Sequence, residues 1–192
     1  ITKDAQFEML EFNYKKCNEI RSYFPEPKTS EEAIDQAVDL INSAKKPFIV
    51  WGQGVILAKA EKEFKTFIEK TGIPSAWTIL GVSAIETAHP LNVGMGGMHG
   101  NYGPNVLTNE CDLLIAIGMR FDDRVTGKLS EFSPQSEKIH IDIDASSINK
   151  NIQVDVGIVG DAGLVLDALI SEMRAQSFEP NGTALEKWCA KD

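Results

Sequence analysis

Cysteine and histidine are scarce in this chain, since its 192 residues include only three of each. The cysteines are Cys17, Cys111 and Cys189. Their odd number and wide spacing exclude a disulfide framework and a paired redox or metal motif, so we expect a reducing compartment and a cytoplasmic protein. The histidines are His89, His99 and His140. They are scattered along the chain, and the sequence therefore predicts no metal site.

Positive charge is also in short supply. The chain has 19 Lys and Arg against 28 Asp and Glu, which gives a formal net charge of -9 and a pI near 4.9. Binding of nucleic acid needs clustered cations that displace counterions, so a nucleic-acid partner is excluded. No apolar run approaches the roughly 20 residues that span a bilayer, so no membrane partner is expected either.

What is present is the composition of an ordinary globular domain, with 43% hydrophobic and 24% charged residues. The chain begins with Ile1 rather than Met, and we expect a processed or excised segment. Residues 1–28 show no period and end in a proline-stiffened stretch, so they are predicted to form a linker. Residues 29–175 are predicted to form the folded domain, and residues 176–192 a linker or tail.

Helical periods and short apolar runs alternate through residues 29–175. Thr29 to Glu32 resembles a capping box, a second helix is predicted to stop at Gly72, and Asp161 is expected to cap a third. Residues 105–109 are predicted to close a short helix, and apolar runs predict strands over residues 47–51, 75–80, 112–117, 138–143 and 154–159. The expected fold class is therefore α/β, a Rossmann-like three-layer domain with a parallel sheet of about six strands.

Ligands of an open parallel sheet bind beyond the carboxyl ends of its strands. Gly52 and Gly54 follow the first predicted strand, but no third glycine stands at Leu57 and no carboxylate ends the next strand. A standard NAD fingerprint is therefore absent, and a nicotinamide-dependent oxidoreductase is disfavoured. The glycine pair serves either a tight turn or a contact with a ligand, and the residues alone leave both alternatives open.

Residues 94–103 contain five glycines in ten residues, together with two Met, a His and a Tyr. Each ordered glycine costs roughly 0.5 to 1 kcal/mol relative to alanine, so we expect a compensating interaction. A mobile surface loop is the simpler alternative, but the Met, His and Tyr side chains favour close approach of the backbone to a flat ligand. A lone histidine such as His99, His89 or His140 is more often a structural residue than a ligand.

Arg120 and Arg124 flank Asp122 and Asp123 directly after the most apolar predicted strand. Mixed charges in a loop usually form a solvated, self-paired cluster. The position beside Gly118, at the ligand end of the sheet, favours binding of a phosphate or carboxylate by at least one arginine.

Three segments together carry a resemblance to a known family. They are residues 95–100 (MGGMHG), 120–127 (RFDDRVTG) and 140–144 (HIDID). They closely resemble the central domain of the catalytic subunit of acetohydroxyacid synthase, also called acetolactate synthase. The resemblance extends over nearly the whole chain and includes residues 44–47 (AKKP) and 69–74 (EKTGIP).

The resemblance implies a function and a set of site residues. That family condenses pyruvate with a second 2-keto acid, pyruvate or 2-ketobutyrate, with loss of CO2 in branched-chain amino-acid biosynthesis. It is a flavoprotein transferase that uses thiamine diphosphate, magnesium and FAD, and the middle domain holds most of the FAD. Arg124 matches the arginine at the substrate channel that selects the second keto acid. The implied FAD-binding residues are Gly52, Gly54, Thr78, Ile79, Leu80, Gly97, Met98, His99, Gly118, Arg120 and Asp122, with Asp142, Ile143, Asp161 and Ala162 toward the adenosine half.

The chain also departs from the family pattern. Gly96 stands where the family usually has leucine, and Val82 and Ser83 vary the segment after Gly81. The family's catalytic glutamate lies in a preceding domain, its metal- and diphosphate-binding motif lies in a following domain, and an arginine used on the flavin lies just upstream. We therefore expect the isolated chain to be inactive, with flanking domains, a homodimeric parent and a regulatory subunit as candidate partners.

The alternative hypothesis is a non-catalytic middle domain of another thiamine-diphosphate enzyme, which serves assembly and binds ADP or no nucleotide. The arginine loop together with the Met-His-Gly loop distinguishes the two hypotheses, because a purely structural domain would need neither.

Overall fold

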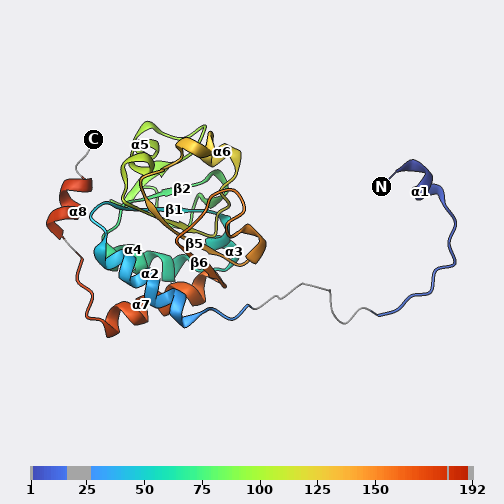
Figure 1. Ribbon diagram of the computed structural model, residues 1–192, viewed down its shortest axis with the longest axis horizontal. Coiled ribbons are helices and arrows are strands. Elements are labelled where there is room, and N and C mark those ends of the chain that lie inside the picture. The colour runs from blue at the N-terminus through green and yellow to red at the C-terminus, as the bar shows by residue number, and fades with distance from the viewer. Residues whose placement is uncertain (1, 17–26, 181, 190–192) are drawn as a thin grey trace.

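The computed structural model describes residues 2–16, 27–180 and 182–189. Six strands form one sheet: β1 (Pro47–Trp51), β2 (Ser75–Trp77), β3 (Asn92–Met95), β4 (Leu113–Ile117), β5 (Glu137–Asp142) and β6 (Val156–Val159). The helices are α1 (Lys3–Phe7), α2 (Glu31–Ser43), α3 (Gln53–Leu57), α4 (Glu61–Thr71), α5 (Tyr102–Glu110), α6 (Asp123–Thr126), α7 (Ala162–Ala175) and α8 (Gly182–Cys189), with short 3-10 turns η1 (Ile79–Gly81), η2 (Leu129–Glu131) and η3 (Ala145–Ser147) (Figure 1).

The sheet has the strand order β3-β2-β1-β4-β5-β6, and every pairing is parallel. This is the order of a Rossmann-type doubly wound sheet. The direction of winding reverses between β1 and β4, and open α/β sheets usually bind their ligands at this point. The predicted α/β class and the parallel sheet of about six strands are confirmed.

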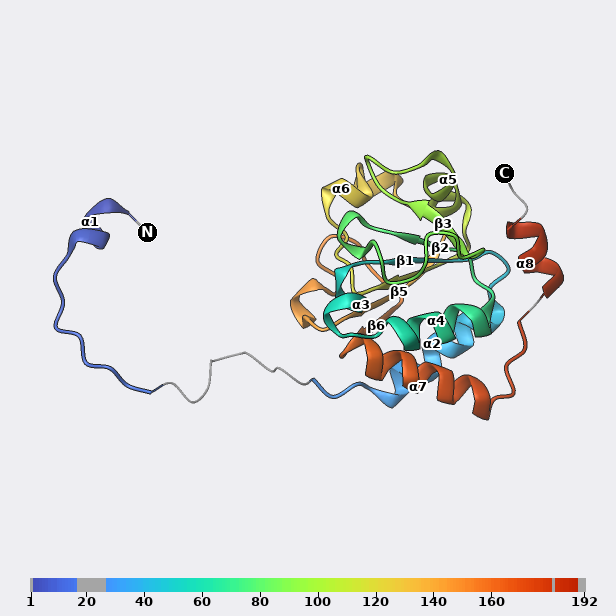
Figure 2. The ribbon, with the colours of Figure 1, turned by 180° about the vertical axis from the view of Figure 1, so that it is seen from behind.

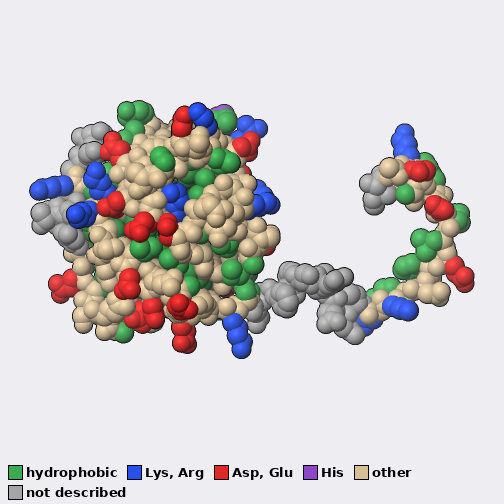
Figure 3. Space-filling model, viewed as in Figure 1, with side chains coloured by type: hydrophobic (Ala, Val, Ile, Leu, Met, Phe, Trp, Pro, Cys, Tyr) green, Lys and Arg blue, Asp and Glu red, His purple; other side chains and the backbone are tan. Residues whose placement is uncertain are grey.

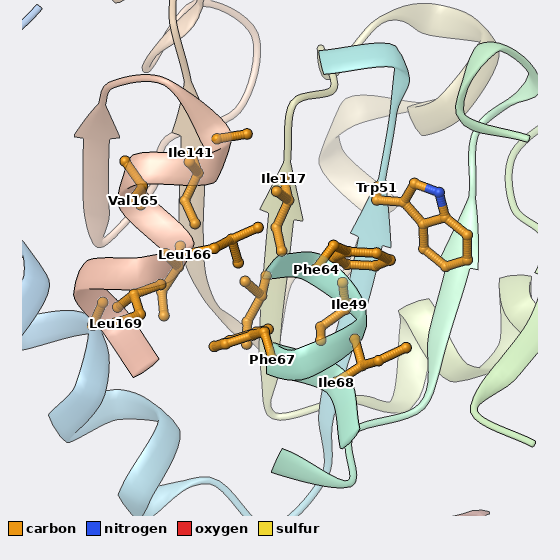
Figure 4. Packing of buried hydrophobic residues seen from close by; sticks show 14 of the residues in the cluster. Ile49, Trp51, Phe64, Phe67, Ile68, Ile117, Ile141, Val165, Leu166 and Leu169 are labelled. Atoms are coloured by element: carbon orange, nitrogen blue, oxygen red, sulfur yellow. The ribbon is translucent and has the colours of Figure 1, made fainter. Parts of the chain in front are cut away.

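Helices cover both faces of the sheet. Figures 1 and 2 show α2, α4 and α7 together on one face, and α5 and α6 on the other. On the first face, Phe64, Phe67 and Ile68 of α4 pack with Leu166 and Leu169 of α7 against the strands (Figure 4). Alternate strand residues point to the two faces, so the central strands are apolar throughout, and all five residues of β1 and of β4 are buried.

The second face has a smaller core. Phe48, Val50, Leu114 and Ala116 point to this side and are covered by α5 and by the loops that follow β4 and β5. Trp188 of α8 joins this core, where its Nε1 donates to the Pro47 carbonyl at 3.0 Å. Part of the segment predicted as a tail, residues 182–189, is thus a helix that docks on the domain.

The predicted helix ends are largely confirmed. Ser30 caps α2 by accepting from the Ala33 N–H, so the cap is present, but a capping-box glutamate is absent because position N3 is Ala33. Gly72 ends α4 in the left-handed conformation, and Asp161 caps α7 by accepting from Gly163 and Leu164. The acidic side chains of α2 and α7 contribute to the red surface on the lower part of the domain in Figure 3.

One strand was predicted too long, and another was not predicted at all. β2 ends at Trp77, not at residue 80, because the chain turns at Thr78 into η1, which the Trp51 Nε1–H holds through the Gly81 carbonyl at 2.8 Å. β3 lies partly inside the glycine-rich segment, residues 94–103, where the sequence predicted no strand. It escaped prediction because it is a half-buried edge strand that contains Asn92 and Gly94 and has no apolar run.

The N-terminal segment lacks a core of its own. The described residues 2–16 contain the short helix α1 and no buried side chain, and their apolar side chains are visible in Figure 3. Most of the predicted proline-stiffened stretch, residues 23–27, and Cys17 lie outside the described residues. No helix among the described residues is long and apolar enough to cross a membrane.

Candidate cofactor-binding site

A cleft of about 700 Å³ opens at the carboxyl ends of the strands. Residues at or just beyond the ends of all six strands line it, and its volume falls in the roughly 300 to 1,000 Å³ range of small-molecule sites. The predicted site residues that line it are Gly54, Thr78, Ile79, Leu80, Met98, His99, Gly118, Arg120, Asp122, Arg124, Asp142, Ile143, Asp161 and Ala162. The fold thus gathers residues that lie more than 100 positions apart in the sequence.

The loops after β1 and β4 cross in direct backbone contact beside the cleft. Gly118 has φ +58, and a Cβ on it would lie 2.7 Å from the Gly54 Cα. The Gly54 N–H donates to the Gly118 carbonyl at 2.9 Å, and a Cβ on Gly52 would lie 2.6 Å from the same carbonyl oxygen. Close packing of the two loops therefore explains all three glycines. Gly54 and Gly118 also present bare backbone to the cleft, whereas Gly52 does not line it.

Asp122 orders the arginine loop, residues 118–127. Its carboxylate accepts from the Arg124 N–H at 3.1 Å and so caps α6. The Arg120 guanidinium lies 3.5 Å from the same carboxylate, but its side chain is 74% exposed. An exposed pair of this kind contributes at most about 1 kcal/mol, so most donors of Arg120 remain available to an anion.

The Met-His-Gly loop, residues 96–100, packs directly on the arginine loop. The Met98 N–H donates to the Arg124 carbonyl at 2.7 Å, and the Arg124 Nη1 lies 3.6 Å from the Met98 sulfur. Gly97 has φ +96, and a Cβ on it would lie 2.7 Å from the Arg124 carbonyl oxygen. Gly97 therefore stands behind the cleft wall and does not line the cleft itself. Met98 and His99 are exposed and line it.

Carboxylates line the cleft at its β5–β6 end. The Asp142 carboxylate accepts from the Asp144 N–H at 2.8 Å, and burial raises the pKa of this side chain. The hydrogen bonds that Asp144 accepts from Ser146 lower the pKa of Asp144. Asp161 accepts the first free N–H groups of α7. The cleft therefore has two arginines in its β4 loop and hydrogen-bond acceptors at its β5–β6 end.

His140 has the structural role that the sequence favoured for a lone histidine. It is fully buried, and its Nε2 hydrogen-bonds the Met119 carbonyl at 2.8 Å. Its ring packs edge-on against Phe121 with centroids 4.9 Å apart. Burial lowers the pKa of His140 and favours the neutral imidazole. Its Nε2 carries the proton, because the Met119 carbonyl can only accept. His140 thus fixes the start of the arginine loop from beneath the cleft.

Several cleft residues escaped the sequence prediction. They are Gln53, Leu57, Ala58, Met95, Gly96, Met119, Val125, Ile141, Asp144, Ser147 and Gly160. Asp144 and Gly160 carried a signal, because each stands at the end of a predicted strand. Leu57 and Ala58 carried none, because α3 has only five residues and no clear period. Among the described residues, no three His, Cys, Asp or Glu side chains are grouped so as to hold a metal ion.

Residues 34–169 match a family described as thiamine pyrophosphate enzyme, central domain. The chain belongs to this family. Among its relatives are the acetolactate synthase large subunit of Corynebacterium glutamicum, 43% identical over 93% of this chain, and the acetolactate synthase of Mycobacterium bovis, 38% identical over 99%. The large subunit of Parasynechococcus marenigrum is 41% identical over 83% of this chain. The resemblance read from the sequence is confirmed at the level of the family.

This thiamine pyrophosphate enzyme central domain spans only part of each relative. The aligned regions cover 29% of the Corynebacterium protein, 31% of the Mycobacterium protein and 26% of the Parasynechococcus protein. All residues that line the cleft, from Gln53 to Ala162, lie within the matched residues.

Proposed function

We propose that this chain is the FAD-binding central domain of an acetolactate synthase. The parent enzyme would condense pyruvate with a second 2-keto acid in branched-chain amino-acid biosynthesis, with thiamine diphosphate and magnesium held by parts of the enzyme outside this chain. The observation that carries the proposal is the convergence of both arginines, the Met-His-Gly loop and the β5–β6 carboxylates on one cleft.

The residues of the cleft fit the chemistry of FAD. Gly54 and Gly118 line the cleft with bare backbone, which allows close approach of a ligand. Ile79, Leu80 and Met98 supply exposed apolar surface for a planar ring system. At the β5–β6 end, the carboxylate of Asp142 is an acceptor suited to ribose hydroxyls.

The two arginines have different proposed roles. Arg120, which is largely exposed, would pair with the FAD diphosphate. Arg124 would pair with the carboxylate of the second keto acid and orient it, and it is the catalytic residue that this chain contributes. When bound, thiamine diphosphate supplies decarboxylation and carbon–carbon bond formation, and FAD shapes the site without net redox change.

The alternative is a structural middle domain that binds ADP or no nucleotide. The β5–β6 end would accept an adenosine group and Arg120 a diphosphate in either case, so the two proposals differ at the apolar surface that would face the flavin ring. A domain that holds only ADP would gain nothing from the apolar surface of Ile79, Leu80 and Met98.

The experiment is a titration of the purified chain with FAD, followed by quenching of flavin fluorescence, and a parallel titration with ADP as competitor. We expect FAD to bind more tightly than ADP, and Arg120→Ala to weaken FAD binding about tenfold, as the loss of one charge-assisted hydrogen bond would. Lys128→Ala is the matched control, because Lys128 is an exposed cation of the neighbouring segment paired with Glu131 outside the cleft. The structural alternative would be supported if ADP bound as tightly as FAD. It would also be supported if Arg120→Ala and Lys128→Ala lost the same amount of FAD affinity.

We also expect no acetolactate from pyruvate with this chain alone, because the resemblance puts the thiamine-binding motifs in other domains. Measurable turnover would contradict the proposal that thiamine diphosphate is bound outside this chain.

A further inference from the structure

Helix α5 carries three asparagines at four-residue spacing, Asn101 at its N-cap, Asn105 and Asn109. Residues four apart lie on one face of a helix, and here that face meets the backbone of two loops. Each carboxamide oxygen accepts one backbone N–H. The donors are Met95 at 3.0 Å, Gly97 at 2.9 Å and Ser133 at 3.0 Å.

Asn105 makes a closer connection than its two neighbours. Its Oδ1 accepts from the Gly97 N–H, and its Nδ2 donates to the Gly97 carbonyl at 3.0 Å. One carboxamide thus satisfies both polar groups of a single backbone residue, as a paired strand would. At φ +96 Gly97 follows the end of β3 and no longer belongs to the sheet. Its carbonyl also accepts from the Gly100 N–H at 2.9 Å, whereas its N–H donates to Asn105.

Gly97 in turn lies against the arginine loop. A Cβ on it would lie 2.7 Å from the Arg124 carbonyl oxygen, and the next residue, Met98, donates its N–H to that oxygen at 2.7 Å. The Gly97 carbonyl that accepts from Asn105 and the Met98 N–H that donates to Arg124 therefore belong to the same peptide group. A shift of the Gly97 peptide would move Met98 and release the Arg124 carbonyl.

We propose that Asn105 is a positioning residue that sets the relative place of the Met-His-Gly loop and Arg124, and thereby the shape of the FAD cleft. It lines no part of the cleft and acts through Gly97. The consequence for FAD rests on the proposed function, but the coupling between Asn105 and the two loops does not.

The first test uses the whole chain and compares two alanine variants. Asn105→Ala removes both hydrogen bonds to Gly97 and should weaken FAD binding about tenfold, as the loss of one to two net hydrogen bonds would. Asn109→Ala is the matched control, since Asn109 lies on the same helix face but hydrogen-bonds Ser133 instead of the Met-His-Gly loop. Equal losses in the two variants would overturn the proposal.

The second test removes the donor and keeps the acceptor. Asn105→Asp can still accept from the Gly97 N–H, but at pH 7 its side chain is an ionised carboxylate with no donor for the Gly97 carbonyl, because the ordinary pKa of aspartate is about 3.9. FAD affinity at pH 7 should therefore fall in Asn105→Asp as it does in Asn105→Ala. Wild-type FAD affinity in Asn105→Asp would overturn the proposal.

The third test needs no ligand. Amide hydrogen exchange in residues 95–100 and 122–126 should speed up in Asn105→Ala and stay at the wild-type rate in Asn109→Ala. Faster exchange in a chain that does not bind FAD would refute the proposed function and keep the role of Asn105. Unchanged exchange with normal FAD binding would refute the role of Asn105 alone.

Discussion

The crossing of the β1 and β4 loops makes Gly118 the most demanding backbone position of the cleft. In Gly118→Ala, the new methyl would lie 2.7 Å from the Gly54 Cα and 2.9 Å from the Val55 nitrogen, and both of these are backbone atoms. The left-handed conformation costs an alanine about 1 to 2 kcal/mol. Forcing the two loops apart adds about 1 to 3 kcal/mol. We therefore expect the free energy of unfolding to fall by roughly 2 to 5 kcal/mol in total.

Urea unfolding measures the loss of unfolding free energy directly. In a thermal melt, the same loss lowers the melting temperature by roughly 2 to 4 °C per kcal/mol for a domain of this size. The matched control is Gly72→Ala, since Gly72 also has a positive φ, +68, but its nearest neighbour is the flexible end of Leu185 at 3.4 Å. The free energy of unfolding of Gly72→Ala should fall by about 1 to 2 kcal/mol, which is the cost of the left-handed conformation alone. Gly118→Ala should also lose FAD affinity, because Gly54 must move. A Gly118→Ala protein no less stable than Gly72→Ala would refute the role given to loop crowding.

Three further predictions concern the surroundings of the cleft. Trp188→Ala should lower the free energy of unfolding by about 3 to 5 kcal/mol and Trp188→Phe by about 1, in urea, because the phenyl ring keeps most of the buried area and loses only the bond to Pro47. His140→Gln should reduce the fall in unfolding free energy below pH 6.5, because the pKa of His140 is lower in the folded state and the unfolded state therefore takes up the proton first. Parallel profiles of unfolding free energy against pH in the wild type and the variant would contradict this. Ser83→Gly should raise the unfolding free energy by about 0.5 to 1 kcal/mol in a thermal or urea melt, because exposed Ser83 has φ +85.

The sequence predicted the strands in the middle of the sheet and the edge strand β6, but it missed the other edge strand, β3. The apolar runs of β1 and β4 are unambiguous because both faces of these strands are buried. β3 pairs on one side only and carries glycine and asparagine, so its pattern resembles a loop. α8 was missed because its burial depends on Trp188 reaching a carbonyl 141 positions away, which no local pattern encodes.

For the cleft, the sequence determined which residues stand at the ends of strands, and parallel pairing then brings those ends to one edge. Glycine content, the arginine pair and the strand-end aspartates predicted one part of the lining, and the family resemblance implied the other part, which includes Thr78, Ile79 and Leu80. Only the tertiary structure decided that Gly52 and Gly97 pack against neighbouring loops behind the cleft wall, and that Asn105 hydrogen-bonds Gly97. Such contacts join segments whose separation in space depends on sheet order and loop path, which local propensity and periodicity do not specify.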